Sequence, residues 1–461
     1  MKTKHFLMLL AVVGVSLFST RFLAGQDQIS GVIKGGDKIP RIAVPDFRGK
    51  GAAQPLMSTF NEVLWDDLEA SGALAMVAKT YYPLEVPQSA AEFRPPTTEG
   101  GRPKKNGPWL TDWSQPPVST GYLAIGNADV NAAGLLVQGW LLNVGERDVR
   151  AAQRFTNPYV GTANEAGARN VAHQFAADIL SNLGIPTLAG SKIYFVSDRT
   201  GKQEIWSMDH DGGNQTLMTR NNTITFMPAV SQDGKLVAYT TNTKDTWAIR
   251  VVQTATNRQQ TFVNPVTSTI STPAFSPDGK KLWFSMVIND YTQIVTSNVD
   301  GGQMQRVSKN RAIELSAKVN PKNPQEVIFI SDRTGHTQLY RMNADGGGVE
   351  MISNGQGEVH NPAWSPDGTK IAFQWNKGFV AGDFNIFIQD LANKTLVQLT
   401  HESGTNENPS WAPDGIHLVY SNQKGRSTQI YSILANGTRV KQLTSQGSTN
   451  KQPVWAVGTT N

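Results

Sequence analysis

The chain has 461 residues, 39% of them hydrophobic, so it is long enough for about two or three domains with sizeable cores. It contains no cysteine, which excludes disulfide bonds and thiolate metal sites. The formal net charge is +5, and it falls to about +2 without the basic residues Lys2, Lys4 and Arg21 of a predicted targeting segment. Because long basic runs interleaved with aromatic residues are also missing, the sequence argues against nucleic-acid binding.

Residues 1–25 have the organisation of a cleavable secretory signal peptide. A basic start is followed by an apolar run over 6–18 and by the small residues Ala24 and Gly25. The run is short for a membrane span, and no later stretch reaches the roughly 18 apolar residues that a spanning helix needs. We therefore expect a mature chain without a transmembrane segment, and an uncleaved N-terminal anchor is the alternative.

Residues 26–187 are predicted to form an α/β domain, beginning with a flexible, polar and Gly-rich segment at 26–38. Residues 93–117, rich in Pro, Gly and charge, are expected to form a long surface connection. The expected elements, in chain order, are a buried strand at 39–47, a helix from Pro55 to Gly72, strands at 73–78 and 135–142, and a helix with Val171, Phe175, Ile179 and Leu183 on one face.

A sequence repeat organises the remaining residues, 188–461. The motif Pro-Ala-Phe-Ser-Pro-Asp-Gly at 273–279 recurs at 362–368 and 409–415, with a weaker copy at 228–234 and a decayed copy at 318–323. The repeat length is about 45 residues, and a period in this range with strand-like content is typical of propeller blades. In each unit the Pro-Asp-Gly turn separates a short first strand from a longer second one, with two further strands behind. Six such units predict an all-β, six-bladed propeller.

The two ends of the repeat array predict how the propeller closes. The first unit begins at its second strand, near Lys192, whereas the chain ends in an unpaired first strand at 452–456. We expect this C-terminal strand to complete the first blade, which would leave the ring without a long free edge.

The mature chain resembles the TolB family, the soluble periplasmic component of the Tol-Pal envelope system. The resemblance is carried by the secretory signal, the Ile-Ala-Val-Pro-Asp-Phe strand at 42–47, and the Trp-Ser-Pro-Asp-Gly repeats with a C-terminal Pro-Val-Trp. Such repeats also occur in prolyl-oligopeptidase-like and tricorn-like propellers, so the combination with the N-terminal domain makes the distinction. The insertion around 94–117 and the lost Pro-Asp-Gly turn at 318–323 depart from the family pattern.

The resemblance implies a non-enzymatic adaptor in the periplasm. The propeller would bind the peptidoglycan-associated lipoprotein Pal, the N-terminal segment would bind the inner-membrane protein TolA, and other outer-membrane lipoproteins or porins would be further partners. Such an adaptor would support outer-membrane integrity, protein import, and invagination during the cell cycle and cell division.

The sequence contains no catalytic, cofactor or metal motif of a common kind: no Gly-x-Ser-x-Gly elbow, no His-Glu-x-x-His and no Gly-rich phosphate loop. Residues 209–214 alternate oxygen-bearing side chains as a calcium loop does, but they lack the terminal Glu, so a hairpin turn is predicted. The Ser-Asp-Arg-Thr-Gly segments at 197–201 and 331–335 are expected to be turns in which Asp bonds the local backbone and Gly has a positive φ.

The segments just before each first strand form the candidate binding surface, because propeller symmetry places all six on one rim of the central channel. Their side chains are dissimilar, as contact with an asymmetric protein requires, and solvated structural loops are the alternative. By the resemblance, residues two to four before the inner-strand Pro contact Pal. The predicted rim residues are Phe226, Met227, Ser271, Thr272, Leu315, His360, Asn361, Glu407, Asn408, Lys451 and Gln452.

The N-terminal segment offers a second candidate. Ile29, Val32 and Ile33 form a short apolar pattern that could pair with a sheet edge in this protein or in another one. The resemblance implies a switch between docking on its own protein and binding TolA, and the alternative is a leader without a role.

Two other functions stay open. A propeller hydrolase or carbohydrate-processing enzyme would use His360 with Glu407. A glycosidase needs two carboxylates that flank one bond, and the rim offers only Glu314 and Glu407, from non-neighbouring blades. A glycan-binding propeller would use channel-proximal tryptophans, although these residues are expected to fill the cores between blades: Trp364, Trp411 and Trp455.

Overall fold

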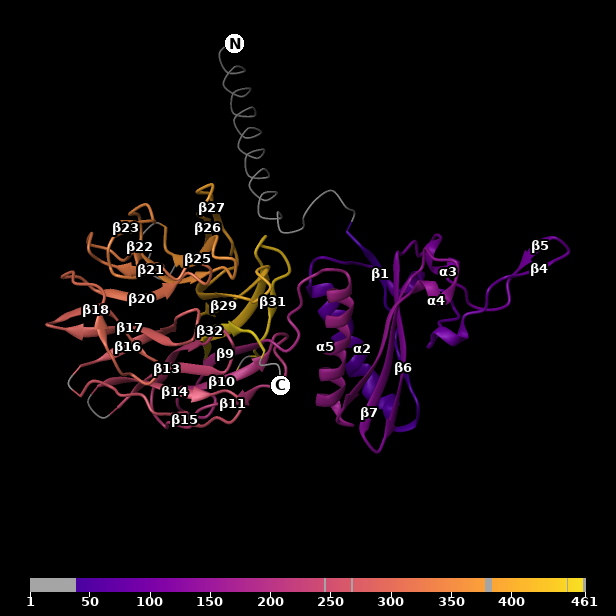
Figure 1. Ribbon diagram of the computed structural model, residues 1–461, viewed down its shortest axis with the longest axis horizontal. Coiled ribbons are helices and arrows are strands. Elements are labelled where there is room, and N and C mark those ends of the chain that lie inside the picture. The colour runs from indigo at the N-terminus through magenta and orange to yellow at the C-terminus, as the bar shows by residue number, and fades with distance from the viewer. Residues whose placement is uncertain (1–38, 244–245, 267, 378–383, 446, 459–461) are drawn as a thin grey trace, which may run out of the picture. The chain divides into compact units, whose positions relative to one another are not determined.

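The computed structural model describes residues 39–458 except 244–245, 267, 378–383 and 446, and these residues form two compact units that divide between Gly190 and Ser191 (Figure 1). The predicted signal peptide at 1–25 and the N-terminal segment with Ile29, Val32 and Ile33 lie outside the described residues. Within the described part of the chain, no helix combines the length and the apolar character needed to cross a membrane.

The N-terminal unit is an α/β domain built on one mixed sheet, as predicted. The sheet has the order β3-β1-β6-β7-β8, with β2 beside β6. β1 pairs in parallel with β3 and β6, whereas β6, β7 and β8 form an antiparallel meander. Its strands are β1 (Arg41–Ala43), β2 (Arg48–Gly49), β3 (Ala75–Met76), β6 (Tyr122–Asn131), β7 (Gly134–Asn143) and β8 (Gln153–Gly161). β1 is shorter than the predicted strand at 39–47, since Pro45 cannot donate to a ladder.

Two long helices, α2 (Met57–Ala70) and α5 (Glu165–Asn182), lie side by side on one face of this sheet (Figure 1). A glycine pair, Gly126 on β6 opposite Gly139 on β7, makes room for them. A Cβ on Gly126 would lie 2.1 Å from the ring of Phe47, and one on Gly139 would lie 2.6 Å from the ring of Phe175. These rings pack on each other with centroids 5.5 Å apart, so the two glycines allow the aromatic core to reach the sheet.

The opposite face of the sheet is covered by part of the insertion at 93–117. The prediction of a surface connection is correct for the exposed hairpin of β4 (Thr97–Glu99) and β5 (Arg102–Lys104). It is wrong for the following residues, because Leu110 and Trp113 are fully buried and share a core with Leu123 of β6. The remaining short elements are η1 (Gly51–Leu56), η2 (Lys79–Tyr81), η3 (Ala90–Glu92), α3 (Thr111–Ser114) and α4 (Val149–Ala152).

The second unit is the predicted six-bladed propeller, and among the described residues it consists of six four-stranded antiparallel sheets. Blade 1 contains β32 (Asn450–Ala456), β9 (Lys192–Ser197), β10 (Glu204–Asp209) and β11 (Thr216–Leu217). Blade 2 contains β12 (Thr225–Val230), β13 (Leu236–Asn242), β14 (Trp247–Gln253) and β15 (Gln259–Gln260). Blade 3 contains β16 (Ile270–Phe275), β17 (Lys281–Ile288), β18 (Tyr291–Asn298) and β19 (Gln305–Arg306).

The other three blades repeat this order from the inner to the outer strand. Blade 4 contains β20 (Glu314–Val319), β21 (Glu326–Ser331), β22 (Gln338–Asn343) and β23 (Glu350–Met351). Blade 5 contains β24 (Val359–Trp364), β25 (Lys370–Trp375), β26 (Asn385–Asp390) and β27 (Leu396–Gln398). Blade 6 contains β28 (Thr405–Trp411), β29 (His417–Lys424), β30 (Ser427–Leu434) and β31 (Lys441–Gln442).

The ring closes as predicted, because the C-terminal strand β32 pairs with β9 of the first blade. Lys451 lies opposite Val196, and the indole Nε1 of Trp455 donates a hydrogen bond to Ser191 Oγ at 3.0 Å. Hydrogen bonds between the two ends of the propeller sequence thus cover the edge of β9 that would otherwise be unpaired.

The predicted turns are present, with one correction. Residues 209–214 form a hairpin turn, in which the Gly212 N–H donates to the Asp209 carbonyl at 3.0 Å. In the two Ser-Asp-Arg-Thr-Gly turns, the glycines have positive φ as expected, and their N–H groups donate to the carbonyls of Asp198 and Asp332 at 2.8 Å. The aspartate carboxylates, in contrast, bond the backbone of other segments. Asp198 Oδ1 accepts the N–H of Thr449 at 2.8 Å, and Asp332 Oδ1 accepts the N–H of Ile313 at 2.7 Å. Each aspartate therefore anchors the residue that precedes an inner strand.

Candidate functional site

The candidate rim is organised by one backbone irregularity that recurs in every inner strand. In β12 the register shifts between Phe226 and Ala229, and Met227 has a φ of 52°. A positive φ is uncommon for residues other than Gly, so its sixfold recurrence shows that the bulge is imposed by the fold. The equivalent residues are Thr272, Ser316, Asn361, Asn408 and Gln452, with φ between 47° and 56°. We call these six residues the bulge ring.

A proline follows the bulge residue in five of the six blades. Because proline has no N–H to donate, a bulge on an inner strand is a position that tolerates it. Blade 4 has Ala317 there instead, yet Ser316 keeps its φ of 55°. The bulge therefore does not depend on the proline.

The bulge ring links neighbouring blades through hydrogen bonds. The Met227 N–H donates to Gln452 Oε1 at 2.8 Å, which joins blades 2 and 1. Asn361 Nδ2 donates to Asn408 Oδ1 at 2.9 Å, which joins blades 5 and 6. Predicted rim residues of the ring thus hold the blades together, and the structure places them on the wall of the central channel.

The other predicted rim residues lie one position earlier, where each pairs with the second strand of its blade. All six are half-buried: Phe226, Ser271, Leu315, His360, Glu407 and Lys451. Consecutive inner strands contact each other in chain order around the ring. The charged or titratable residues therefore sit on the adjoining blades 5, 6 and 1, while Phe226 and Leu315 sit on blades 2 and 4.

Sequence reasoning missed two exposed apolar residues, one beside Phe226 on blade 2 and one beside Leu315 on blade 4. Ile224 is 48% exposed just before β12, and Ile313 is 47% exposed just before β20. They extend the apolar surface that begins with Phe226, whose ring packs edge-on against Trp247 with centroids 4.8 Å apart. An isoleucine flanking the start of an inner strand was the available signal.

Gln374 of β25 is the centre of a polar cluster that the sequence reasoning also missed. Its Oε1 accepts hydrogen bonds from Asn361 Nδ2 and from the Asn408 N–H, each at 2.9 Å. Its Nε2 donates to Glu407 Oε1 at 3.2 Å. Burial raises the pKa of the Glu407 carboxyl, while the bond from Gln374 and the charge of Lys451 oppose that rise. A glutamine between Phe373 and Trp375 in a buried strand was the signal.

His360 stands at the edge of this cluster. Its Nε2 lies 3.3 Å from Thr337 Oγ1 and 3.9 Å from Glu358 Oε2, and its ring centroid lies 5.5 Å from that of Phe384. Burial lowers the pKa of His360, and Glu358 opposes that shift. The imidazole is thus held between polar and aromatic neighbours.

The carboxylate pair of the enzymatic alternative does not form. Glu314 is fully buried and accepts a hydrogen bond from Arg333, the arginine of the turn at 331–335. Glu407 lies on blade 6, two blades away from Glu314, and bonds Gln374 instead. A glycosidase needs two carboxyl groups that flank one bond, and a buried Glu314 held by Arg333 cannot be one of them.

The three tryptophans of the glycan-binding alternative are buried between blades, with exposures of 6–9%. Trp364 Nε1 donates to the Lys318 carbonyl of the neighbouring blade at 3.0 Å. Trp364 and Trp411 belong to hydrophobic cores, so they fill the space between blades as expected.

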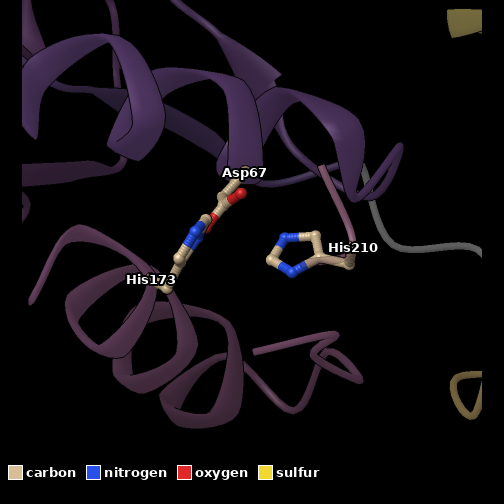
Figure 2. Close-up of side chains that lie close together, drawn as sticks. All are labelled: Asp67, His173 and His210. Carbon is tan, nitrogen blue, oxygen red and sulfur yellow. The ribbon is translucent and has the colours of Figure 1, made fainter. Parts of the chain in front are cut away.

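In the N-terminal unit, one buried polar pair joins the two long helices. Figure 2 shows Asp67 of α2 and His173 of α5 pointing toward one another, and Asp67 Oδ2 lies 2.6 Å from His173 Nδ1. Both side chains are less than a tenth exposed. This pair fixes α2 against α5 and thereby supports the packing of the domain.

The fold defines the class of the protein: a small α/β domain joined to a six-bladed β-propeller that the C-terminal strand closes. The chain matches the family described as the TolB beta propeller domain over residues 183–358 and 347–460, which is more than half of its length. The chain belongs to the TolB family.

Relatives and a solved structure agree with this membership. The chain is 31% identical over 183 residues to a protein TolB homolog of Chlorobium luteolum, which covers 40% of this chain and 41% of that protein. It is 29% identical over 255 residues to a protein TolB homolog of Chlorobium chlorochromatii, covering 55% and 45%. The chain therefore spans less than half the length of these curated relatives. The crystal structure of TolB from Acinetobacter baumannii has the same fold, with a TM-score of 0.73 and 22% identity over 92% of this chain and 98% of that one.

Proposed function

We propose that this protein is a non-enzymatic adaptor of the Tol-Pal system in the periplasm, to which a signal peptide directs it. The propeller rim binds the peptidoglycan-associated lipoprotein Pal, and the N-terminal segment binds TolA. Membership of the TolB family supports the general role, and the fold shared with a TolB over both domains supports the same division of labour.

The observation that carries the proposal is a repeated backbone with unrepeated side chains. All six inner strands have the same bulge, yet the residues before it differ in every blade. A structural loop has no reason to differ between blades, whereas a surface for one asymmetric partner needs a different contact at each position.

The rim has two halves that suit different parts of a partner. Ile224 and Phe226 on blade 2 and Ile313 and Leu315 on blade 4 expose apolar surface, which stabilises an interface by burial. On blades 5, 6 and 1 the rim carries His360 and charged side chains, which favour hydrogen bonds and charge complementarity. A lipoprotein domain with an apolar contact beside a polar one would fit this surface.

The test is a titration of the full mature chain with the lipid-free Pal domain of the same organism, followed by calorimetry. Replacing Ile313 by Ala should weaken binding by about 1–3 kcal/mol, because the side chain is exposed in the free protein and would be buried against the partner in the complex. The matched control is Leu396→Ala on the outer strand of blade 5, a residue of similar size that is 42% exposed and remote from the inner strands.

The proposal is wrong if Pal fails to bind the wild-type chain, or if Ile313→Ala and Leu396→Ala bind it with the same affinity as the wild type. Recovery of a glycan without any lipoprotein from an envelope extract would favour the glycan-binding alternative instead.

A further inference from the structure

The central channel contains a cavity that the proposed adaptor function does not use. The cavity has a volume of about 490 Å³ and is lined by all six inner strands. Its lining runs from the bulge ring to the prolines that open the turns between first and second strands, about five residues or roughly 16 Å along each strand. The residues of the rim one position before the bulge, such as His360, are not part of it. The cavity therefore extends from the bulge ring toward the end of the propeller that carries the turns.

The charge of this cavity has one sign. Among the described residues that line it, Lys318 and Lys322 are charged and positive, and no Asp or Glu is present. Lys318 occupies a position that faces the channel in every blade, where the other five blades have small or apolar residues. These residues are Ala229, Ala274, Ala363, Ser410 and Val454.

The amine of Lys318 has no partner within the part of the chain that the structure describes. Among the residues that the structure describes, its Nζ forms no ion pair or hydrogen bond, although the side chain is only partly exposed. Burial lowers the pKa of Lys318 to about 8, so the amine is still mostly protonated at neutral pH. A partly buried ammonium with three unused donors is unfavourable unless an anion pairs with it.

The fourth blade departs from the repeat in a consistent direction. In blades 2 and 3 the turn carries Asp233 and Asp278, which accept hydrogen bonds from Ser231 and Ser276 and lie outside the cavity lining. Blade 4 has Lys322 at the same place and Lys318 within the channel. The copy of the motif that looked decayed has thus exchanged an acid for a base and added a second base.

We propose that the channel is a carboxylate-binding site, in which the ammonium of Lys318 pairs with a carboxylate that enters from the turn face. A phosphate site in a protein usually combines several backbone N–H groups, a helix N-terminus or an Arg fork. The lining here offers one deep ammonium among prolines and tryptophans, which matches a singly charged group. The volume suits a small free acid or the acidic side chain of a peptide. Lys322, exposed at the mouth, would attract either of them.

The experiment uses the full mature chain with its lysines methylated by ¹³C-formaldehyde, which keeps their charge. The Lys318 resonance is assigned by its absence in Lys318→Met. Four probes are titrated: glutarate, the capped peptide acetyl-GGEGG-amide, its counterpart with Gln in place of Glu, and inorganic phosphate. The Lys318 resonance should shift saturably with at least one of the first two probes, and at least tenfold more of the Gln peptide or of phosphate should be needed.

Calorimetry with the unmodified protein then locates the binding energy. Lys318→Met should lower the affinity for the effective probe at least tenfold, while Lys322→Met should lower it by no more than about threefold. Lys235→Met, which changes an exposed lysine at the blade 2 turn, is the matched control and should have no effect. Lys318→Gln serves the same purpose if the Met variant does not fold.

The outcomes separate the sources and decide the proposal. Binding of glutarate alone identifies a free acid as the ligand, and binding of the Glu peptide identifies an acidic segment of another chain. The proposal fails if neither probe shifts the Lys318 resonance saturably, if Lys318→Met retains full affinity, or if phosphate binds as well as the carboxylates. Each of these results is independent of whether Pal binds the rim, so failure here leaves the adaptor function intact.

Discussion

Replacing Arg333 by Ala should destabilise the propeller strongly, because the substitution leaves a buried carboxylate without its cation. Glu314 is fully buried, and Arg333 donates to its Oε1. The guanidinium also lies over the ring of Tyr340, with its carbon 4.8 Å from the ring centroid. Breaking a buried ion pair from one side costs about 3–5 kcal/mol, and the lost cation–π contact adds about 0.5–1 kcal/mol.

The propeller supplies its own control for this prediction. Arg199 occupies the same turn in blade 1 and stacks on Trp206 at 4.4 Å, but it donates to the neutral Asn450 Oδ1 at 3.0 Å. Arg199→Ala removes a similar stack and leaves no buried charge behind. We therefore expect it to cost about 2–4 kcal/mol, of which a hydrogen bond with one charged partner accounts for about 1.5–3 kcal/mol and the stack for about 0.5–1 kcal/mol.

Differential scanning calorimetry measures the effect on the melting transition of the propeller. For a domain of this size, about 1 kcal/mol shifts the melting temperature by roughly 2–4 °C, so Arg333→Ala should lower it by about 7–24 °C. Adding Glu314→Gln should recover at least half of the loss, because a neutral amide is easier to bury than an unpaired charge. Equal losses for Arg333→Ala and Arg199→Ala, or no recovery in the double variant, would refute the role given to the buried charge.

Three further predictions concern the rim, the channel and the N-terminus. His360→Ala should weaken Pal binding by about 1–4 kcal/mol in calorimetry and leave the melting temperature almost unchanged. Asn361→Ala should instead lower the melting temperature, because Asn361 bonds Gln374 and Asn408. The reversed pattern would contradict this division between a contact residue and a structural residue. Lys318→Met should raise the free energy of unfolding at pH 7 by about 1–3 kcal/mol, because one pKa unit corresponds to about 1.4 kcal/mol and burial lowers this pKa from 10.5 to about 8. That gain is complete below pH 8 and vanishes as the pH rises past 10.5, above which both states are neutral. Denaturation curves with equal gains at the two ends of this pH range would be inconsistent with the prediction. Deleting residues 26–31 should abolish TolA binding and change the affinity for Pal by the coupling energy between the two sites. Titrations that give wild-type affinities for both partners would show that the segment is not a switch.

Much of the fold could be predicted because the signals for it are local. A blade is made of neighbouring strands joined by short turns, so its Pro-Asp-Gly motif and apolar runs recur every 45 residues or so along the chain. The closure of the ring also followed from the sequence, since a first strand without a partner at 452–456 matched a first unit without a first strand. The rim followed from the same symmetry, which places equivalent residues of all blades at one end of the channel.

What the tertiary structure decided depends on residues that are distant in the sequence. Trp113 lies in a segment rich in Pro, Gly and charge, and only its packing against the sheet made it a core residue. Asp198 bonds the backbone of Thr449, 251 residues away, which no local turn rule could anticipate. Lys318 looked like the sign of a decayed repeat, and its meaning changed once the other five blades surrounded it with uncharged residues. Burial and pairing are properties of neighbours in space, so the sequence determined the blades and their order, while the assembled ring decided which side chains are structural and which are left to bind.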